Sequence, residues 1–137
     1  MDINEAKLLN GLALAYMGDA VFEVAIRDYL LGTGKTKPNQ LHQTATRYVS
    51  AKAQARMIAE MLESELLTEE EISYYKRGRN SKINTKAKNT DIQTYLHSTG
   101  FEALIGFLYL TKQQERLDTL IEWCIEFVGR KRGMNSE

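Results

Sequence analysis

Apolar residues recur at helical spacing along almost the whole chain, and this periodicity constrains the fold more than any other feature. Leu8, Leu12 and Ala15 begin one apolar face, and similar three- and four-residue spacings return in each later segment. Strand-like alternation is hard to find, and the sequence contains a single proline, Pro38. The pattern therefore predicts an all-α fold, a helical bundle with short connections.

Apolar faces and end signals together define the expected helices. Pro38 suits the first turn of a helix, and Thr68 followed by Glu71 has the spacing of a capping box. We expect helices from Leu8 to the glycines at 32 and 34, from Pro38 toward Leu62, from Thr68 to Arg77, from a cap at 89–91 to Tyr109, and from Gln114 to Phe127. Residues 78–89 are expected to form a long loop, and residues 129–137 a flexible tail.

Length and composition indicate one ordinary globular domain over residues 1–137. Hydrophobic residues make up 43% of the chain and charged residues 26%, a balance typical of soluble proteins. The lone cysteine, Cys124, lies in an apolar pattern and is expected to be buried. No run is long and uncharged enough to span a bilayer, and the N-terminus lacks a secretory signal, so we expect a cytoplasmic protein with no membrane partner.

Charge is segregated along the chain although its formal sum is zero. Residues 60–71 are strongly acidic, whereas residues 76–88 contain six basic residues and no acid. Such a segment is often just a solvated surface, but its loop character favours contact with RNA phosphates. The candidate RNA-binding residues are Lys76, Arg77, Arg79, Asn80, Lys82, Lys86 and Lys88.

Two acids, Asp19 and Glu102, stand in otherwise apolar helical runs. An ionised carboxylate that faces a core needs a cation, a metal or several hydrogen-bond donors, so two such acids suggest a shared cation. Spacing alone leaves other readings open, since Asp19 could cap a helix after Gly18 and Glu102 could face solvent.

The segments Met17-Gly18-Asp19-Ala20-Val21 and Phe101-Glu102-Ala103-Leu104-Ile105-Gly106 resemble the two signatures of the ribonuclease III catalytic domain. The chain is similar above all to Mini-ribonuclease III, the bacterial branch without a double-stranded-RNA-binding domain. The resemblance implies a homodimeric endoribonuclease that uses Mg²⁺, or Mn²⁺ as a substitute, to cut double-stranded RNA. It further implies 5′-phosphate and 3′-hydroxyl ends and a role in maturing the 23S ribosomal RNA precursor, and leaves open whether a ribosomal protein assists.

In this resemblance Asp19 and Glu102 are the catalytic residues and the metal ligands. Typical members of the larger family have further acids at places that here hold Leu12, Ala15 and Thr99, which favours one firmly held ion. Thr99 and Glu23 lie on the faces of the two acids and are candidates for a supporting role around the metal. Glu23 also precedes Arg27 by four residues, the spacing of a structural ion pair.

Two non-catalytic alternatives remain at this stage. The missing acids permit an RNA-binding or ribosome-assembly module on the same fold, and pairing of both acids with Lys or Arg would indicate a helical scaffold. His42 and His97 lack partner histidines or cysteines at metal-ligand spacing, so surface or hydrogen-bonding roles are expected for them.

Overall fold

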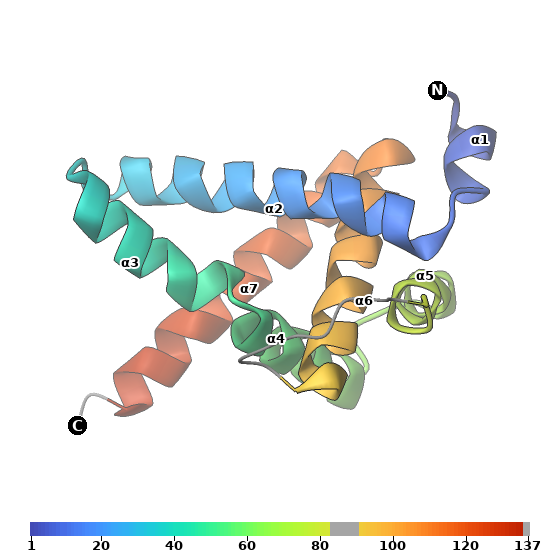
Figure 1. Cartoon of the computed structure of the whole chain (residues 1–137). Helices are drawn as coiled ribbons and strands as arrows, with labels where there is room; N and C mark the ends of the chain where they lie inside the picture. The colour runs from blue at the N-terminus through green and yellow to red at the C-terminus, as the bar shows by residue number, and fades with distance from the viewer. Residues whose placement is uncertain (83–90, 136–137) are drawn as a thin grey trace.

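The computed structural model describes residues 1–82 and 91–135, with side chains for 1–82 and 91–130, and every regular element in these ranges is an α-helix. This confirms the all-α prediction. The helices are α1 (Ile3–Lys7), α2 (Gly11–Gly32), α3 (Pro38–Val49), α4 (Ala51–Glu63), α5 (Glu69–Arg79), α6 (Ile92–Leu110) and α7 (Gln114–Asn135). Figure 1 shows α2 running along one edge, with α6 crossing beneath it, and α3 running from the far end of α2 toward α4. Helices α4, α5 and α7 pack against α6.

Helix α6 forms the centre of the core. Ten of its residues, from Ser98 to Leu108, are buried, and the helix packs against α2, α4, α5 and α7. Phe101 is fully buried and meets Phe22 of α2 edge to face, with 5.1 Å between ring centroids. Because neighbours cover α6 on several sides, its sequence is apolar nearly all round.

The backbones of α2 and α6 touch where the helices cross. A Cβ on Gly18 would overlap the carbonyl oxygen of Glu102, and it would lie 2.8 Å from the nitrogen of Gly106. A Cβ on Gly106 would overlap the carbonyl oxygen of Leu14. Each helix thus has a glycine where its partner's backbone needs the space.

Two helix boundaries differ from the sequence-based prediction. The first expected helix begins at Gly11 and not at Leu8, because Asn10 caps α2 by accepting a hydrogen bond from the Ala13 amide at 2.9 Å, and the short α1 before it was not predicted. The second is two helices, since Ser50 ends α3 in an extended conformation and caps α4 through the Ala53 amide. Short polar side chains that capture a backbone amide override the continuous apolar pattern at both places.

Several capping and burial predictions are confirmed. Pro38 is at the start of α3, Asp91 accepts a hydrogen bond from the Thr94 amide, and Cys124 is fully buried, which raises the pKa of its thiol. Thr68 and Glu71 form the capping box of α5.

Glu71 also receives two hydrogen bonds from the guanidinium of Arg116 on α7, at 2.8 and 2.9 Å. Burial alone would raise the pKa of Glu71, but the hydrogen bonds from Arg116 and Thr68 outweigh it and lower the pKa. This bidentate pair ties the start of α5 to α7.

The loop predicted from residue 78 begins later than expected. Helix α5 continues through Arg79, and Gly78 is buried against Gly100 and Ala103 of α6. The rest of that expected loop, residues 83–90, lies outside the described residues. At the other end, α7 extends to Asn135 and so includes most of the segment expected to be a tail. Within the described chain, no helix has the length and apolarity to cross a membrane.

Candidate active site

The crossing of α2 and α6 places Asp19 and Glu102 side by side. Asp19 follows Gly18, which lies against the backbone of Glu102, and Glu102 is one helical turn before Gly106. The two carboxyl groups interact directly: burial, followed by the hydrogen bond and charge of Asp19, raises the pKa of Glu102 to about 8. The pair therefore retains a proton near neutral pH unless a cation compensates its charge.

The two acids are not equally buried. Glu102 is half-buried within the bundle, whereas Asp19 lies on the exposed side of α2. The expectation that both acids face the core was thus wrong for Asp19, which is exposed although the preceding Gly18 is buried. An opening to solvent on one side is what a site for an external phosphate needs.

A third residue, Gln54 of α4, reaches this pair and was missed by the sequence analysis. Its side chain is hydrogen-bonded to the Glu102 carboxyl and is only 2% exposed. The available signal was weak: a lone glutamine among alanines on the apolar face of a helix. Helix α4 packs against α6, which brings Gln54 to the site.

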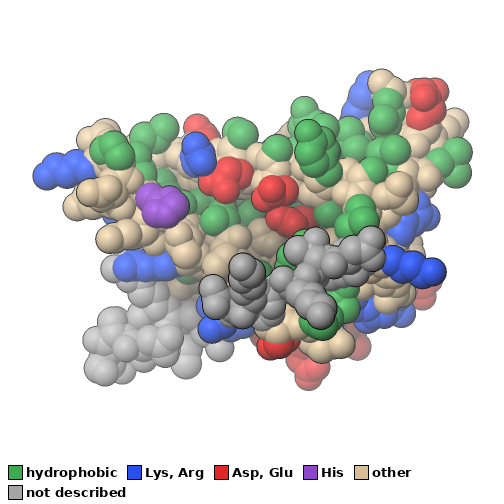
Figure 2. Space-filling model, in the orientation of Figure 1, with side chains coloured by type: hydrophobic (Ala, Val, Ile, Leu, Met, Phe, Trp, Pro, Cys, Tyr) green, Lys and Arg blue, Asp and Glu red, His purple; other side chains and the backbone are tan. Residues whose placement is uncertain are grey.

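The donor set at the crossing suits a hard divalent cation. Carboxylate oxygens are preferred by Mg²⁺, which retains several waters and often takes only one or two carboxylates from the protein. No group of three or more His, Cys, Asp or Glu residues forms a metal cluster among the described residues, so two acids are the available charge. Figure 2 shows acidic side chains gathered at the centre of the front face, next to α2.

The two candidate supporting residues have other partners. Glu23 accepts a hydrogen bond from Arg27 at 2.9 Å, which confirms the predicted ion pair. Thr99 is buried, and its hydroxyl donates to the carbonyl of Tyr95 at 3.0 Å. Of the places where the larger family has further acids, Leu12 is partly exposed and Ala15 is buried.

In the described part of the basic segment, the two arginines contact other groups of the protein, whereas the two lysines are exposed. Arg77 donates to the carbonyls of Lys7 and Leu9 at 2.8 and 2.9 Å and lies over the Tyr74 ring, so it joins α5 to the end of α1 and the connection that follows it. Arg79 lies over the Tyr75 ring and donates to Asn80.

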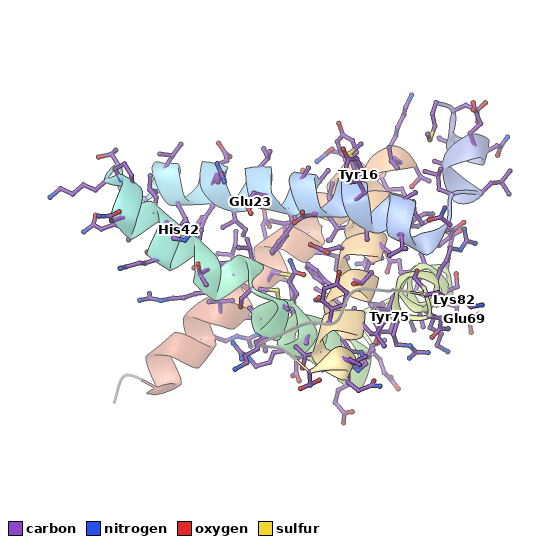
Figure 3. All side chains as sticks on the ribbon, viewed as in Figure 1. Tyr16, Glu23, His42, Glu69, Tyr75 and Lys82 are labelled. Carbon is purple, nitrogen blue, oxygen red and sulfur yellow. The ribbon has the colours of Figure 1, made fainter. Side chains whose placement is uncertain are left out.

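Lys76 is exposed in the last turn of α5, and Lys82 is exposed shortly after the helix ends. Figure 3 labels Lys82 near this end of α5. The other two candidates, Lys86 and Lys88, lie outside the described residues.

The histidines have the roles expected from their spacing. His42 is exposed on α3, and His97 shares a 2.6 Å hydrogen bond with the hydroxyl of the buried Tyr75. Burial raises the pKa of Tyr75, so its hydroxyl stays protonated.

Comparison with known proteins identifies the family. Residues 12–113 match the Ribonuclease III domain. Mini-ribonuclease 3 of Enterococcus faecalis is 61% identical over 127 residues, which cover 93% of this chain and 96% of that protein. Mini-ribonuclease 3 of Staphylococcus aureus is 52% identical, with coverages of 93% and 96%. A crystal structure of a Fusobacterium nucleatum protein superposes with a TM-score of 0.78 at 33% identity, covering 87% of this chain and 93% of that one.

The matched residues include the crossing of α2 and α6 and the two motifs that contain Asp19 and Glu102. Similarity to ribonucleases over this region decides against a non-catalytic RNA-binding module and against a helical scaffold. The chain therefore belongs to the Mini-ribonuclease 3 family, and it is an endoribonuclease of the ribonuclease III type that acts on double-stranded RNA with the aid of a divalent metal.

Proposed function

We propose that Asp19 and Glu102 together hold one Mg²⁺ ion and form the catalytic centre of this endoribonuclease. The observation that carries the proposal is the direct interaction of the two carboxyl groups at a glycine-mediated helix crossing. Among the described residues no Lys or Arg forms an ion pair with either acid, and two adjacent acids are costly unless a cation joins them. Mn²⁺, which accepts the same oxygen ligands, would substitute.

A bound Mg²⁺ supplies Lewis-acid activation of water and offsets negative charge on the scissile phosphate. The chain's part is to present two carboxylates on helices whose spacing cannot relax, because Gly18 and Gly106 have backbone against them. Glu102 would have to lose its proton to hold a metal ion, so metal affinity should rise with pH. The site has fewer acids than that of typical family members, whose further acids are replaced by Leu12, Ala15 and Thr99. Fewer negative ligands offset less repulsion between two cations, which favours one bound ion over two.

We assign the basic end of α5 to the RNA duplex. Lys76 and Lys82 are exposed there, and Figure 2 shows basic side chains toward the end of the molecule where α5 lies. A-form RNA is recognised mainly through its phosphates and 2′-hydroxyls, for which Lys, Arg79 and Asn80 are suitable partners. Lys86 and Lys88, which lie outside the described residues, remain proposed RNA contacts on the grounds of sequence alone. Arg77 supports the proposed surface from its position between α5 and α1.

A homodimer is supported by the outer face of α2. Leu12, Tyr16, Ala20 and Val24 follow one another at four-residue intervals and are all exposed, Tyr16 by 83% and Val24 by 67%. Figure 3 shows Tyr16 on α2. An apolar stripe of this length on a helix is typical of an interface between copies. With one site in each subunit, the two strands of a duplex would each be cut once.

We further propose that the substrate is the 23S ribosomal RNA precursor and that the products carry 5′-phosphate and 3′-hydroxyl ends. Likeness to the Mini-ribonuclease 3 proteins supports this choice. Cleavage assays with and without added ribosomal proteins would test whether one of them takes part. The proposed substrate implies a cytoplasmic location.

The central test replaces each acid by its amide. Asp19→Asn and Glu102→Gln should each lower cleavage of a labelled RNA duplex by several orders of magnitude, while circular dichroism and duplex binding stay unchanged. Glu63→Gln, at an exposed acid of α4, is the matched control and should cleave normally. Full cleavage by either site variant would reject the assignment.

A further inference from the structure

We propose that Gln54 is a positioning residue for the reaction: its buried side-chain amide holds the Glu102 carboxylate in the orientation that shares a metal ion with Asp19. The inference rests on the proposed metal site and adds a third helix, α4, to it. Nothing in the sequence motifs of α2 and α6 points to this residue.

The burial of Gln54 requires a specific partner. Glutamine is usually exposed, yet this side chain is 2% exposed and lies among Ala53, Met57 and Ile58, which are buried in the same helix. No buried side-chain nitrogen or oxygen among the described residues lacks a hydrogen-bond partner. The partner of Gln54 is the Glu102 carboxyl, to which its amide donates. The hydrogen bond that offsets the cost of burying the Gln54 amide also restricts the orientation of the Glu102 carboxyl.

The position beside the Glu102 carboxyl needs a side chain that donates a hydrogen bond and carries no charge. Lysine or arginine would form an ion pair with Glu102 and compete with the metal, whereas a third acid would add to the repulsion between Asp19 and Glu102. An amide orients one carboxylate oxygen without changing the net charge of the pair. Partners of metal ligands commonly act in this way, and their loss costs about 10- to 100-fold in metal affinity or activity.

Gln54→Met removes the amide and keeps the length of the side chain. We expect Mn²⁺ binding to the RNA-free protein, measured by electron paramagnetic resonance, to weaken roughly 10- to 100-fold. The Mg²⁺ concentration that gives half-maximal cleavage should rise by a similar factor. RNA binding without divalent metal and the unfolding temperature should stay close to those of the parent protein.

Ser98→Ala is the matched control, because Ser98 is also buried and polar but donates to the Tyr95 carbonyl within α6. It should leave Mn²⁺ affinity unchanged. In a Glu102→Gln background, Gln54→Met should cause no further loss of Mn²⁺ affinity, because Gln54 acts through Glu102. If Gln54→Met does not fold, Gln54→Asn retains a buried amide but withdraws it from Glu102, and the same weakening is expected.

Different outcomes separate this inference from the proposed function. If Asp19→Asn binds Mn²⁺ as well as the parent protein, the metal site itself is wrong. If Asp19→Asn loses Mn²⁺ while a folded Gln54→Met or Gln54→Asn binds it normally, only the role of Gln54 is refuted. Failure of both variants to fold would also refute it, since Gln54 would then serve packing alone.

Discussion

Replacing Gly18 by alanine tests the claim that the α2–α6 crossing creates the active site. The new Cβ would overlap the Glu102 carbonyl oxygen and lie 2.7 Å from the Glu102 carbonyl carbon, where ordinary contacts are 3.4–4 Å. Backbone cannot rotate away, so the helices must separate. Overpacking of this kind costs roughly 3 kcal/mol, and the better helix propensity of alanine returns about 1 kcal/mol. We expect a net loss of roughly 2 kcal/mol in the free energy of unfolding, or about 5–10 °C in Tm.

The measurement is urea and thermal denaturation at one fixed protein concentration, together with cleavage by the folded variant. Cleavage should fall further than the folded fraction does, because separation of the helices moves Asp19 away from Glu102. Gly129→Ala on α7 is the matched control: nothing lies within 4 Å of its Cβ position, so it should stabilise by about 0.5–1 kcal/mol. A Gly18→Ala protein as stable and active as the parent would refute the argument.

Three further predictions concern pH, a buried ion pair and RNA binding. Because the folded pKa of Glu102 is about 8 against an ordinary 4.5, the folded metal-free protein binds the extra proton, so its stability should decrease by a few kcal/mol as pH rises through that interval. Urea titrations in a chelator should show this slope, and it should vanish in Glu102→Gln. Arg116→Met leaves the Glu71 carboxylate buried and unpaired and should cost roughly 3 kcal/mol, whereas Arg27→Met, at an exposed pair, should cost under about 0.5 kcal/mol in the same denaturation assay. Lys82→Ala should weaken duplex binding and reduce the slope of log affinity against log salt by about 1 in fluorescence anisotropy, and an unchanged slope would remove Lys82 from the interface.

Local signals in the sequence were sufficient for most of the helical structure. Pro38, the Thr68 capping box and Asp91 each mark a helix start, because they act on amides within a few residues along the chain. The start of α2 after Asn10 and the break at Ser50 differ from the prediction, since the apolar spacing continues across both residues and conceals the caps. The structure has helix where a loop is predicted from residue 78, because Gly78, a residue that usually signals a turn, serves a close helix contact instead.

The sequence by itself determined the helical class, the family and the two acids, because these depend on periodicity and on short contiguous motifs. Only the tertiary structure decided that Glu102 is the more buried acid, that burial and then Asp19 raise its pKa, and that Gln54 joins them from a third helix. Such properties depend on which backbones can touch, and here two glycines some 90 residues apart allow it. Contacts between residues so distant in sequence leave no trace in local spacing.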